Sequence, residues 1–401
     1  MTNQSNAKKL TITPKGISVF LLIVYIFFSF TSAETLLPPV LHSLSMYAFL
    51  GWSLLCYILS KKFTIPGFTV WLLLMLALSF FSWFWAEHQV GSAIYIIFVA
   101  LVITFFVIQT IDKYEYLETC LIAFVFSADV MGIMLAVTGQ ITEEERLGEN
   151  VTGNANSFSA LLMIAAVCAL WCWFYKSGKV QRIFHFSSAI FLLVLMAFSG
   201  GRKTIIGVFV CWIWFLFVKN ASKAWGYLKA IFKISLLLFA IYLIMMKIPF
   251  MYDLVGFRFE GLFDFLSGGS STVGSDKLRA KMVEIGLKKW LDSPFIGYGI
   301  DTFKYYNRRM TGHFYYAHNN YVELLYDLGI VGFLAYYGYI AYMIKKLIKM
   351  KKESDKYRAF GIGIVFLLLF YDLGGISYYA TFMLLVLSLA FICYHIDAKN
   401  V

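Results

Sequence analysis

The stretch that decides the fold is "FHFSSAIFLLVLMAFSGGRKTIIGVFVCWIWFLFV", residues 184–218. It contains two apolar segments that are separated only by a short turn carrying Arg202 and Lys203. At about 1.5 Å per helical residue, each segment can cross most of a hydrocarbon core about 30 Å thick. The pattern predicts a helical hairpin in a membrane, with two cations at its turn.

The rest of the chain has the same character. Of its 401 residues, 60% are hydrophobic and 14% are charged, against about 45–50% and about 25% in soluble domains. Its apolar runs are continuous, whereas the strands of a β-barrel would alternate. We expect an all-α polytopic membrane protein, with residues 1–401 forming a single integral membrane domain without a removable signal peptide. We place about twelve spans at residues 16–33, 43–60, 68–86, 91–110, 116–138, 156–175, 183–199, 203–219, 230–248, 321–345, 358–374 and 377–396.

The distribution of Lys and Arg predicts the orientation. The short connections at 34–42, 87–90 and 375–376 carry neither residue, whereas the alternate connections are basic, above all residues 345–358. By the positive-inside rule, both termini lie in the cytoplasm and the chain belongs to the cytoplasmic (inner) membrane. Residues 249–320 then form a long extracytoplasmic loop. This orientation also accounts for the net charge of +11 without a nucleic acid partner.

Three further features of the loops and spans lead to predictions. Residues 275–294 predict an amphipathic helix with Leu278, Met282, Ile285 and Leu291 near one face. All six cysteines lie in apolar runs without a C-x-x-C pair, so we expect buried thiols, no metal and no cofactor. Asp129 and Asp327 lie inside predicted spans, where a carboxylate serves either function or a structural partner on a neighbouring helix.

The segment "YYAHNNYVELLYDLGIVGFLAYY", residues 315–337, carries the clearest chemistry. Asn319 or Asn320 can cap the following helix, with Glu323 near the capping-box position. His318 lies at the predicted outer surface, where an imidazole can accept a proton near neutral pH. The alternative is an interfacial histidine without a function.

Several cations are predicted to meet on the same outer surface as His318. Guanidinium groups match phosphate oxygens bidentately and stay charged at any working pH. A diphosphate site is therefore one interpretation, and pairing with lipid headgroups or with nearby acidic residues is the other. The cations concerned are Arg146, Arg202, Lys203, Arg258 and Arg279.

Four segments, taken in order, resemble the O-antigen ligase and polymerase family, which comprises Wzy-type polysaccharide polymerases and WaaL-type ligases. The resemblance covers roughly residues 140–345, and the earlier spans match only in hydropathy. The segments are "GENVTGNANSFSALL" with Asn154 and Asn156, "SGGRKTIIG", "LRAKMVEIGLKKWLDSPFIGYGIDTF" and "AHNNYVELLYDLGIVGF".

The resemblance implies a GT-C-like, metal-independent glycosyltransferase whose donor is a saccharide on undecaprenyl diphosphate at the outer face of the membrane. The family's arginines match Arg202, Arg279 and, more loosely, Arg258, and its histidine matches His318. We expect His318 and Arg202 to be catalytic. Arg258, Arg279, Lys203 and Arg146 would bind the diphosphate, with Asn319, Glu323, Asn154 and Asn156 in support.

Three functions are compatible with these residues. We favour a polymerase of O-antigen or capsule repeat units, because the Ile-, Phe-, Tyr- and Lys-rich composition suggests an AT-rich source common for such clusters. The first alternative is a ligase that transfers glycan to a lipid A core or a protein. The second is a lipid-linked oligosaccharide flippase, which should instead line a mid-membrane cavity with ionisable groups. The expected partners are the lipid-linked oligosaccharide, membrane lipid, a chain-length regulator and a flippase.

Overall fold

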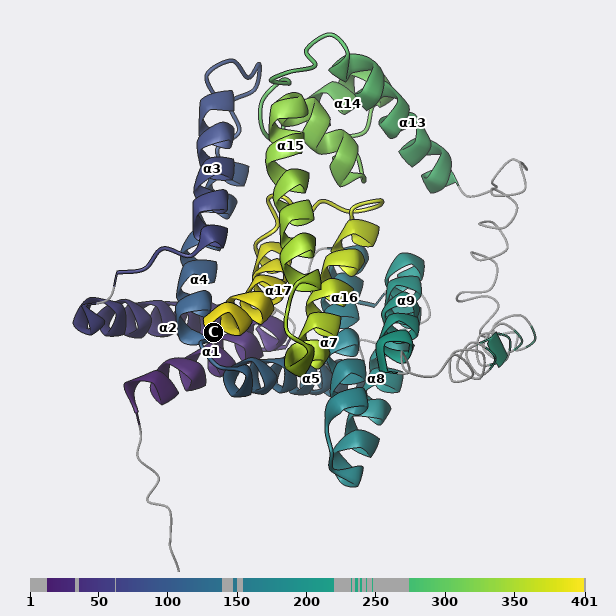
Figure 1. Cartoon of the computed structure of the whole chain (residues 1–401). Helices are drawn as coiled ribbons and strands as arrows, with labels where there is room; N and C mark the ends of the chain where they lie inside the picture. Colours follow the sequence, from purple (N-terminus) through teal and green to yellow (C-terminus); the bar gives the residue numbers. More distant parts are fainter. Residues whose placement is uncertain are drawn as a thin grey trace, which may run out of the picture.

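A computed structural model describes residues 13–32, 36–61, 63–138, 147–149, 154–219 and 274–399, with six single helical residues between 232 and 247. Every regular element in this part of the chain is a helix (Figure 1). The helices are α1 (Pro14–Thr31), α2 (Pro39–Ser60), α3 (Gly67–Ser82), α4 (Ser92–Thr110), α5 (Tyr114–Val137), α7 (Ala155–Tyr175), α8 (Lys179–Ser199), α9 (Arg202–Lys219), α13 (Gly274–Trp290), α14 (Phe303–Thr311), α15 (Asn320–Ile348), the 3₁₀ helix η2 (Lys352–Ser354), α16 (Asp355–Tyr371) and α17 (Thr381–Lys399).

Eight of these helices are long and apolar enough to cross a membrane: α1, α2, α4, α5, α7, α8, α15 and α17. The prediction of an all-α, multi-pass membrane protein is therefore confirmed. The predicted spans at 68–86, 203–219 and 358–374 coincide with α3, α9 and α16, which are shorter or more highly charged. The span at 230–248 lies outside the described residues apart from single positions, so the count of twelve stays a prediction.

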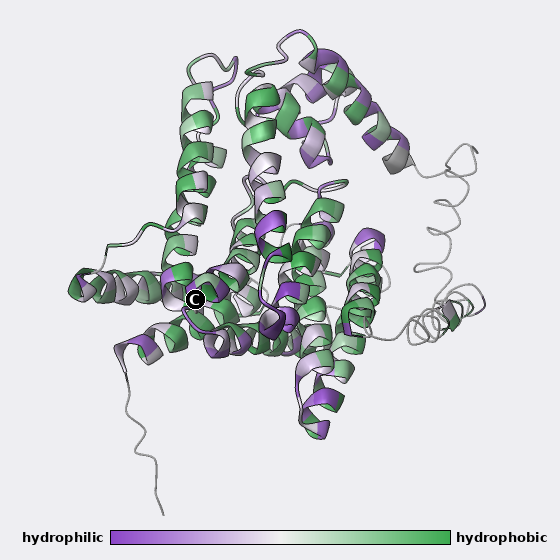
Figure 2. Cartoon of the chain, in the orientation of Figure 1, coloured by the Kyte–Doolittle hydropathy of each residue, from purple (hydrophilic) through white to green (hydrophobic). Residues whose placement is uncertain are grey.

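Helices α7 and α17 form the centre of the bundle. In α7, 83% of the spanning window is buried inside the protein, against 17% in α2. Helix α7 packs against α5, α8 and α9, and α17 packs against α4 and α16. Figure 2 shows mostly apolar residues along α2, α3 and α4, as expected for helices that face lipid. Polar residues are concentrated along α13 and at the first turn of α9.

The predicted hairpin of α8 and α9 is present, and its two glycines make its turn possible. Gly200 has φ 70°, and the N–H groups of Gly200 and Gly201 donate to Ala197 O (2.9 Å) and Met196 O (3.2 Å). This is the hydrogen-bond pattern of a Schellman cap. A Cβ at Gly201 would overlap Ser159 Oγ on α7. The turn therefore packs on the first turns of α7, and α9 begins at Arg202.

Helix α15 is interrupted at Gly329, which has φ 63° and ψ −166°. The backbone groups released there bond to the 293–302 segment: Ile330 N donates to Pro294 O (2.8 Å), and Gly299 N donates to Asp327 O (2.8 Å). Irregular backbone within a membrane-spanning helix is tolerated only where protein groups satisfy it. The 293–302 segment supplies those groups.

The two carboxylates inside the spans have structural partners. Asp327 is fully buried and accepts hydrogen bonds from the backbone N–H of Asp301 (2.8 Å) and from the hydroxyl of Tyr378. Asp129 accepts a hydrogen bond from the hydroxyl of Ser188 (2.6 Å). The structural alternative for Asp327 also explains how the 293–302 segment is held against α15.

The predicted amphipathic helix is α13. Its Met282 and Ile285 are buried against Phe303, Val322 and Tyr326, at the start of α14 and in the first turns of α15. The placement of Leu291 on the apolar face was wrong. The helix ends at Trp290, and Leu291, which follows it, is 66% exposed.

We predict that Gly329→Ala destabilises the protein by roughly 2–5 kcal/mol, because this region of φ and ψ is accessible only to glycine and because the new Cβ would overlap the Phe295 backbone. The matched control is Gly338→Ala on the same helix, where a Cβ meets no atom within 4 Å. Thermal unfolding in nanodiscs would show a lower Tm for the first variant alone. Equal Tm values would contradict the role assigned to the interruption.

Candidate functional site

His318 lies in the connection between α14 and α15, two residues before the helix begins. Its φ is 51°, in the left-handed region that is unusual for a residue other than glycine. Its ring lies 4.2 Å from the ring of Tyr316 and 6.2 Å from that of Tyr315, measured between centroids. The imidazole is thus partly enclosed by aromatic rings.

Two of the predicted cations act on His318 from different helices. Burial, together with the charges of Arg279 on α13 and Lys203 on α9, lowers the pKa of His318 to about 4, and burial is the largest cause. Neutral imidazole is therefore the form present near pH 7. The structure brings Lys203, which lies more than 100 positions before His318 in the sequence, and Arg279 to the same place, as the predicted convergence requires.

Asn154 connects the N-terminus of α7 to the surroundings of His318. Its side chain accepts a hydrogen bond from Asn156 N (2.8 Å), which caps α7, and it is hydrogen-bonded to Tyr316. Tyr316 also lies within the field of Arg279. Asn154 therefore contacts the ring that packs on His318, whereas Asn156 contributes its backbone N–H to the cap.

Asn319 and Glu323 determine how the backbone enters α15. Asn319 is the N-cap, and its side chain accepts a hydrogen bond from Val322 N (3.1 Å), so the capping role is confirmed. The carboxylate of Glu323 is fully buried and accepts from Ala317 N (2.5 Å), outside the capping box. These two bonds flank His318 and stabilise its left-handed conformation.

A buried network that the sequence analysis missed lies beneath the site. Asn320 N donates to Asp372 O (2.8 Å), and Asn320 Oδ1 accepts from Ser377 N (2.8 Å), so the segment after α16 is bound to the start of α15. A Cβ at Gly374 in this segment would overlap Lys203 Nζ. Glycine there allows the lysine side chain to cross the segment. Asn320, the second asparagine of "HNN", was the feature of the sequence that could have indicated this network, because a buried amide needs several hydrogen-bond partners.

The other predicted cations divide into two groups. Arg202 is the first residue of α9, next to Lys203. Both cations therefore lie at the positive end of the helix dipole, where they oppose helix formation but favour a bound anion. Arg146 and Arg258 lie outside the described residues. Among the described residues no group of three or more His, Cys, Asp or Glu side chains could hold a metal ion.

The arrangement can carry out two chemical tasks at one place. Lys203, Arg279 and the N-terminus of α9 together create a positive field that suits a phosphate or diphosphate. His318, neutral and beside that field, can accept a proton from a hydroxyl group.

We predict that Arg279→Gln raises the pKa of His318 from about 4 towards its ordinary value, because a nearby cation disfavours the imidazolium and its removal favours protonation. The pH dependence of acylation at His318, followed by mass spectrometry, measures this pKa. Arg308→Gln is the control, since Arg308 is an exposed cation that is not among the charges acting on His318. An unchanged or lower pKa in Arg279→Gln would contradict the assigned electrostatics.

Part of the chain that carries these residues matches a known protein family. Residues 187–337 match the family model of the O-antigen ligases, and this region contains Arg202, Lys203, Arg279 and His318. No curated protein matches the chain. The matched region supports a function of the O-antigen ligase or polymerase type, in an enzyme that resembles glycosyltransferases. The similarity to the O-antigen ligases is thus located in residues 187–337 of the chain.

Proposed function

We propose that the protein is a glycosyltransferase that polymerises undecaprenyl-diphosphate-linked oligosaccharide repeat units at the outer face of the cytoplasmic membrane. One observation carries the proposal: a neutral histidine lies within the field of two cations that α9 and α13 bring to it. A transferase that uses a lipid diphosphate as leaving group needs such a base beside such a field.

In the proposed step, a hydroxyl of the acceptor saccharide attacks the anomeric carbon of the donor saccharide. His318 takes the hydroxyl proton as the new carbon–oxygen bond forms. The bond between the anomeric carbon and the phosphate oxygen breaks, and the electron pair leaves with the undecaprenyl diphosphate. Arg202, Lys203 and Arg279, together with Arg258, stabilise the charge that grows on this leaving group. A single displacement without a covalent intermediate inverts the anomeric configuration.

The low pKa of His318 makes its strength as a base depend on whether the donor is bound. In the free protein the cations keep the imidazole neutral but make it a weak base. A bound diphosphate offsets the positive field, so the pKa of His318 rises towards neutrality. The base thus becomes effective when the donor is in place.

Polymerase and ligase activities share this chemistry and differ in the acceptor. The acceptor is a second lipid-linked repeat unit in a polymerase, and a lipid A core or a protein in a ligase. The flippase alternative receives no support, because the mid-span Asp129 and Asp327 have structural partners. We retain the polymerase as the proposal.

The test is transfer by the purified protein in proteoliposomes supplied with the lipid-linked repeat unit alone. We expect a ladder of products from the wild type. His318→Gln should lower kcat about 10²–10⁴-fold, as for the loss of a general base, and Arg202→Ala about 10²–10³-fold, as for the loss of leaving-group stabilisation. The control is His395→Gln, which changes a partly buried histidine near the far end of α17.

The outcomes separate the alternatives. Transfer only after a lipid A core or a protein is added would identify a ligase. A ladder that survives His318→Gln would exclude the general-base role. No transfer with any of these acceptors would contradict the proposal as a whole.

A further inference from the structure

A line of aromatic rings leads away from His318 across the 293–319 region, and the proposed chemistry assigns it no role. The rings of His88 and Tyr305 are stacked with centroids 4.1 Å apart, and Tyr305 contacts Phe314 edge-on at 5.1 Å. Tyr315 follows Phe314 in the chain, and its ring lies 6.2 Å from His318. We name His88, Tyr305, Phe314 and Tyr315 the aromatic track.

The track is open to ligands. Phe314 is 46% exposed and Tyr315 is 50% exposed, whereas the next two residues, Tyr316 and Ala317, turn into the protein. Exposed aromatic faces present an apolar surface to the C–H groups of a pyranose ring, and tyrosine adds a hydroxyl for the sugar's polar edge. Contiguous exposed apolar surface of this kind marks a binding site more often than chance.

Cations flank the middle of the track. Lys304 Nζ lies 5.7 Å from the Phe314 ring centroid, and the Arg308 guanidinium lies 6.0 Å from it. Lys304 pairs with Asp301, but no carboxylate among the described residues pairs with the exposed Arg308. A guanidinium beside an aromatic surface suits a ligand that carries both sugars and phosphate.

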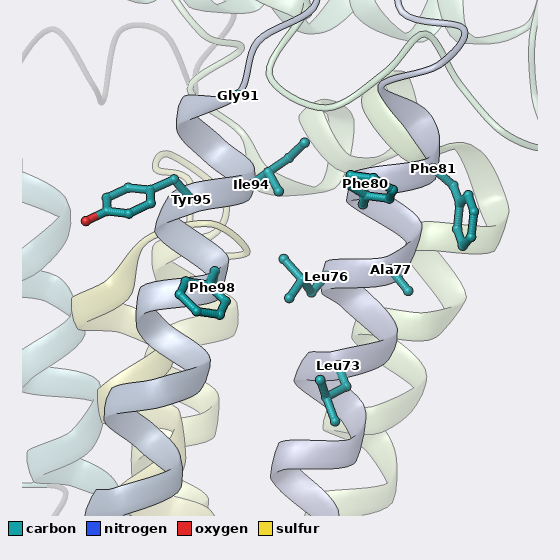
Figure 3. A pocket seen from close by; sticks show the side chains of 9 residues that line it. All are labelled: Leu73, Leu76, Ala77, Phe80, Phe81, Gly91, Ile94, Tyr95 and Phe98. Atoms are coloured by element: carbon teal, nitrogen blue, oxygen red, sulfur yellow. The ribbon is translucent and has the colours of Figure 1, made fainter. Parts of the chain in front are cut away.

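An apolar groove of about 570 Å³ lies between α3 and α4 near the other end of the track. Figure 3 shows Leu76 and Phe80 of α3 and Ile94 of α4 pointing into the space between the helices. Gly91, which also lines the groove, is three residues from His88. The volume lies within the range of about 300–1,000 Å³ that is common for small-molecule sites.

The α3–α4 connection is bound to the region that carries the track. Glu87 forms a bidentate ion pair with Arg309 of α14 (2.7 and 2.8 Å), and Ile300 N donates to Ser82 Oγ (3.1 Å). These contacts fix the position of the groove relative to the cations and the track. An apolar chain in the groove would place its polar head at Arg308.

We propose that the aromatic track is the acceptor-saccharide subsite and that the α3–α4 groove holds the apolar tail of the lipid carrying this saccharide. The assignment rests on the proposed function, in which His318 activates an acceptor hydroxyl. The acceptor's anomeric carbon is linked to the lipid phosphate, so the attacking oxygen is another hydroxyl of the saccharide and lies at a distance from that phosphate. Phe314, beside Arg308, and Tyr315, beside His318, span this separation.

This placement keeps the two substrates apart. The donor's diphosphate lies at Lys203 and Arg279, whereas the acceptor's phosphate lies at Arg308. In Figure 1, α9 appears on one side of α15, and α3 and α4 on the other. The acceptor that fits is a single-tailed lipid-linked saccharide, which is the acceptor of a polymerase.

The first test measures KM in proteoliposomes for two analogues of the lipid-linked repeat unit. One lacks the acceptor hydroxyl and serves only as donor, and the other has a phosphonate at the anomeric carbon and serves only as acceptor. Tyr305→Ala and Phe314→Ala should raise the KM for the acceptor about five- to tenfold, as expected for the loss of one aromatic contact, and leave the KM for the donor unchanged. The control is Phe295→Ala, which removes an exposed aromatic side chain (70%) of the same region but outside the track. Track variants that behave like Phe295→Ala, in a protein whose wild type transfers, would overturn the subsite; the rings would then only anchor the protein at the membrane surface.

The second test concerns the groove. Ala77→Trp fills it, whereas Leu74→Trp places the same side chain on α3 outside it. We expect the first variant alone to raise the KM about tenfold for the long-chain acceptor, and not for the same saccharide on a short-chain lipid. Equal KM values for both variants would show that the groove holds only membrane lipid.

A binding experiment separates this inference from the proposed function. Saturation-transfer NMR with the lipid-free repeat-unit oligosaccharide and nanodisc-embedded protein should detect contacts at sugar C–H protons. The signals should disappear in the Tyr305→Ala/Phe314→Ala double variant and remain in Phe295→Ala. Retained signals in the double variant would overturn the subsite, whereas track-dependent signals in a protein without transfer would support it and contradict only the proposed function.

Discussion

The backbone pairing between the 293–302 segment and the interrupted helix α15 is the contact on which the rest of the site depends. A helix broken at Gly329 exposes polar groups that the membrane cannot satisfy, and the segment satisfies them through Pro294 and Gly299. The segment is in turn anchored by the buried Asp327. Helices α13 and α14 flank the segment, so the break positions Arg279 and the aromatic track relative to His318.

The fold places positive charge beside His318. Buried carboxylates lie close by and have their own partners: one oxygen of Glu323 accepts from Ala317 N, and Asp301 pairs with Lys304. The field that reaches His318 from Arg279 and Lys203 is positive. Such a site costs stability in the free protein, since like charges repel, and it regains that free energy when an anion binds.

Helix termini carry much of the chemistry. Asn154 and Lys203 lie at the starts of α7 and α9, and His318 lies just before α15. Gly201 lets the α8–α9 turn approach α7, and Gly374 leaves room for the Lys203 side chain. The same elements in a bundle with larger residues at these two positions could not meet. Small residues therefore set the geometry, whereas the cations and the histidine supply the reactivity.

The sequence by itself determined the class of the fold and the residue types of the site. Continuous apolar runs predict membrane helices, in which the backbone groups bond to one another within each segment. The local motifs around Arg202, Arg279 and His318 indicated the chemistry. Leu291 was misplaced because helix ends depend on contacts beyond the helix. Periodicity also could not reveal the break at Gly329, the Asn320 network or the left-handed His318. Only the tertiary structure decided these, since each depends on hydrogen bonds and charges between segments far apart in the chain, which local pattern does not encode.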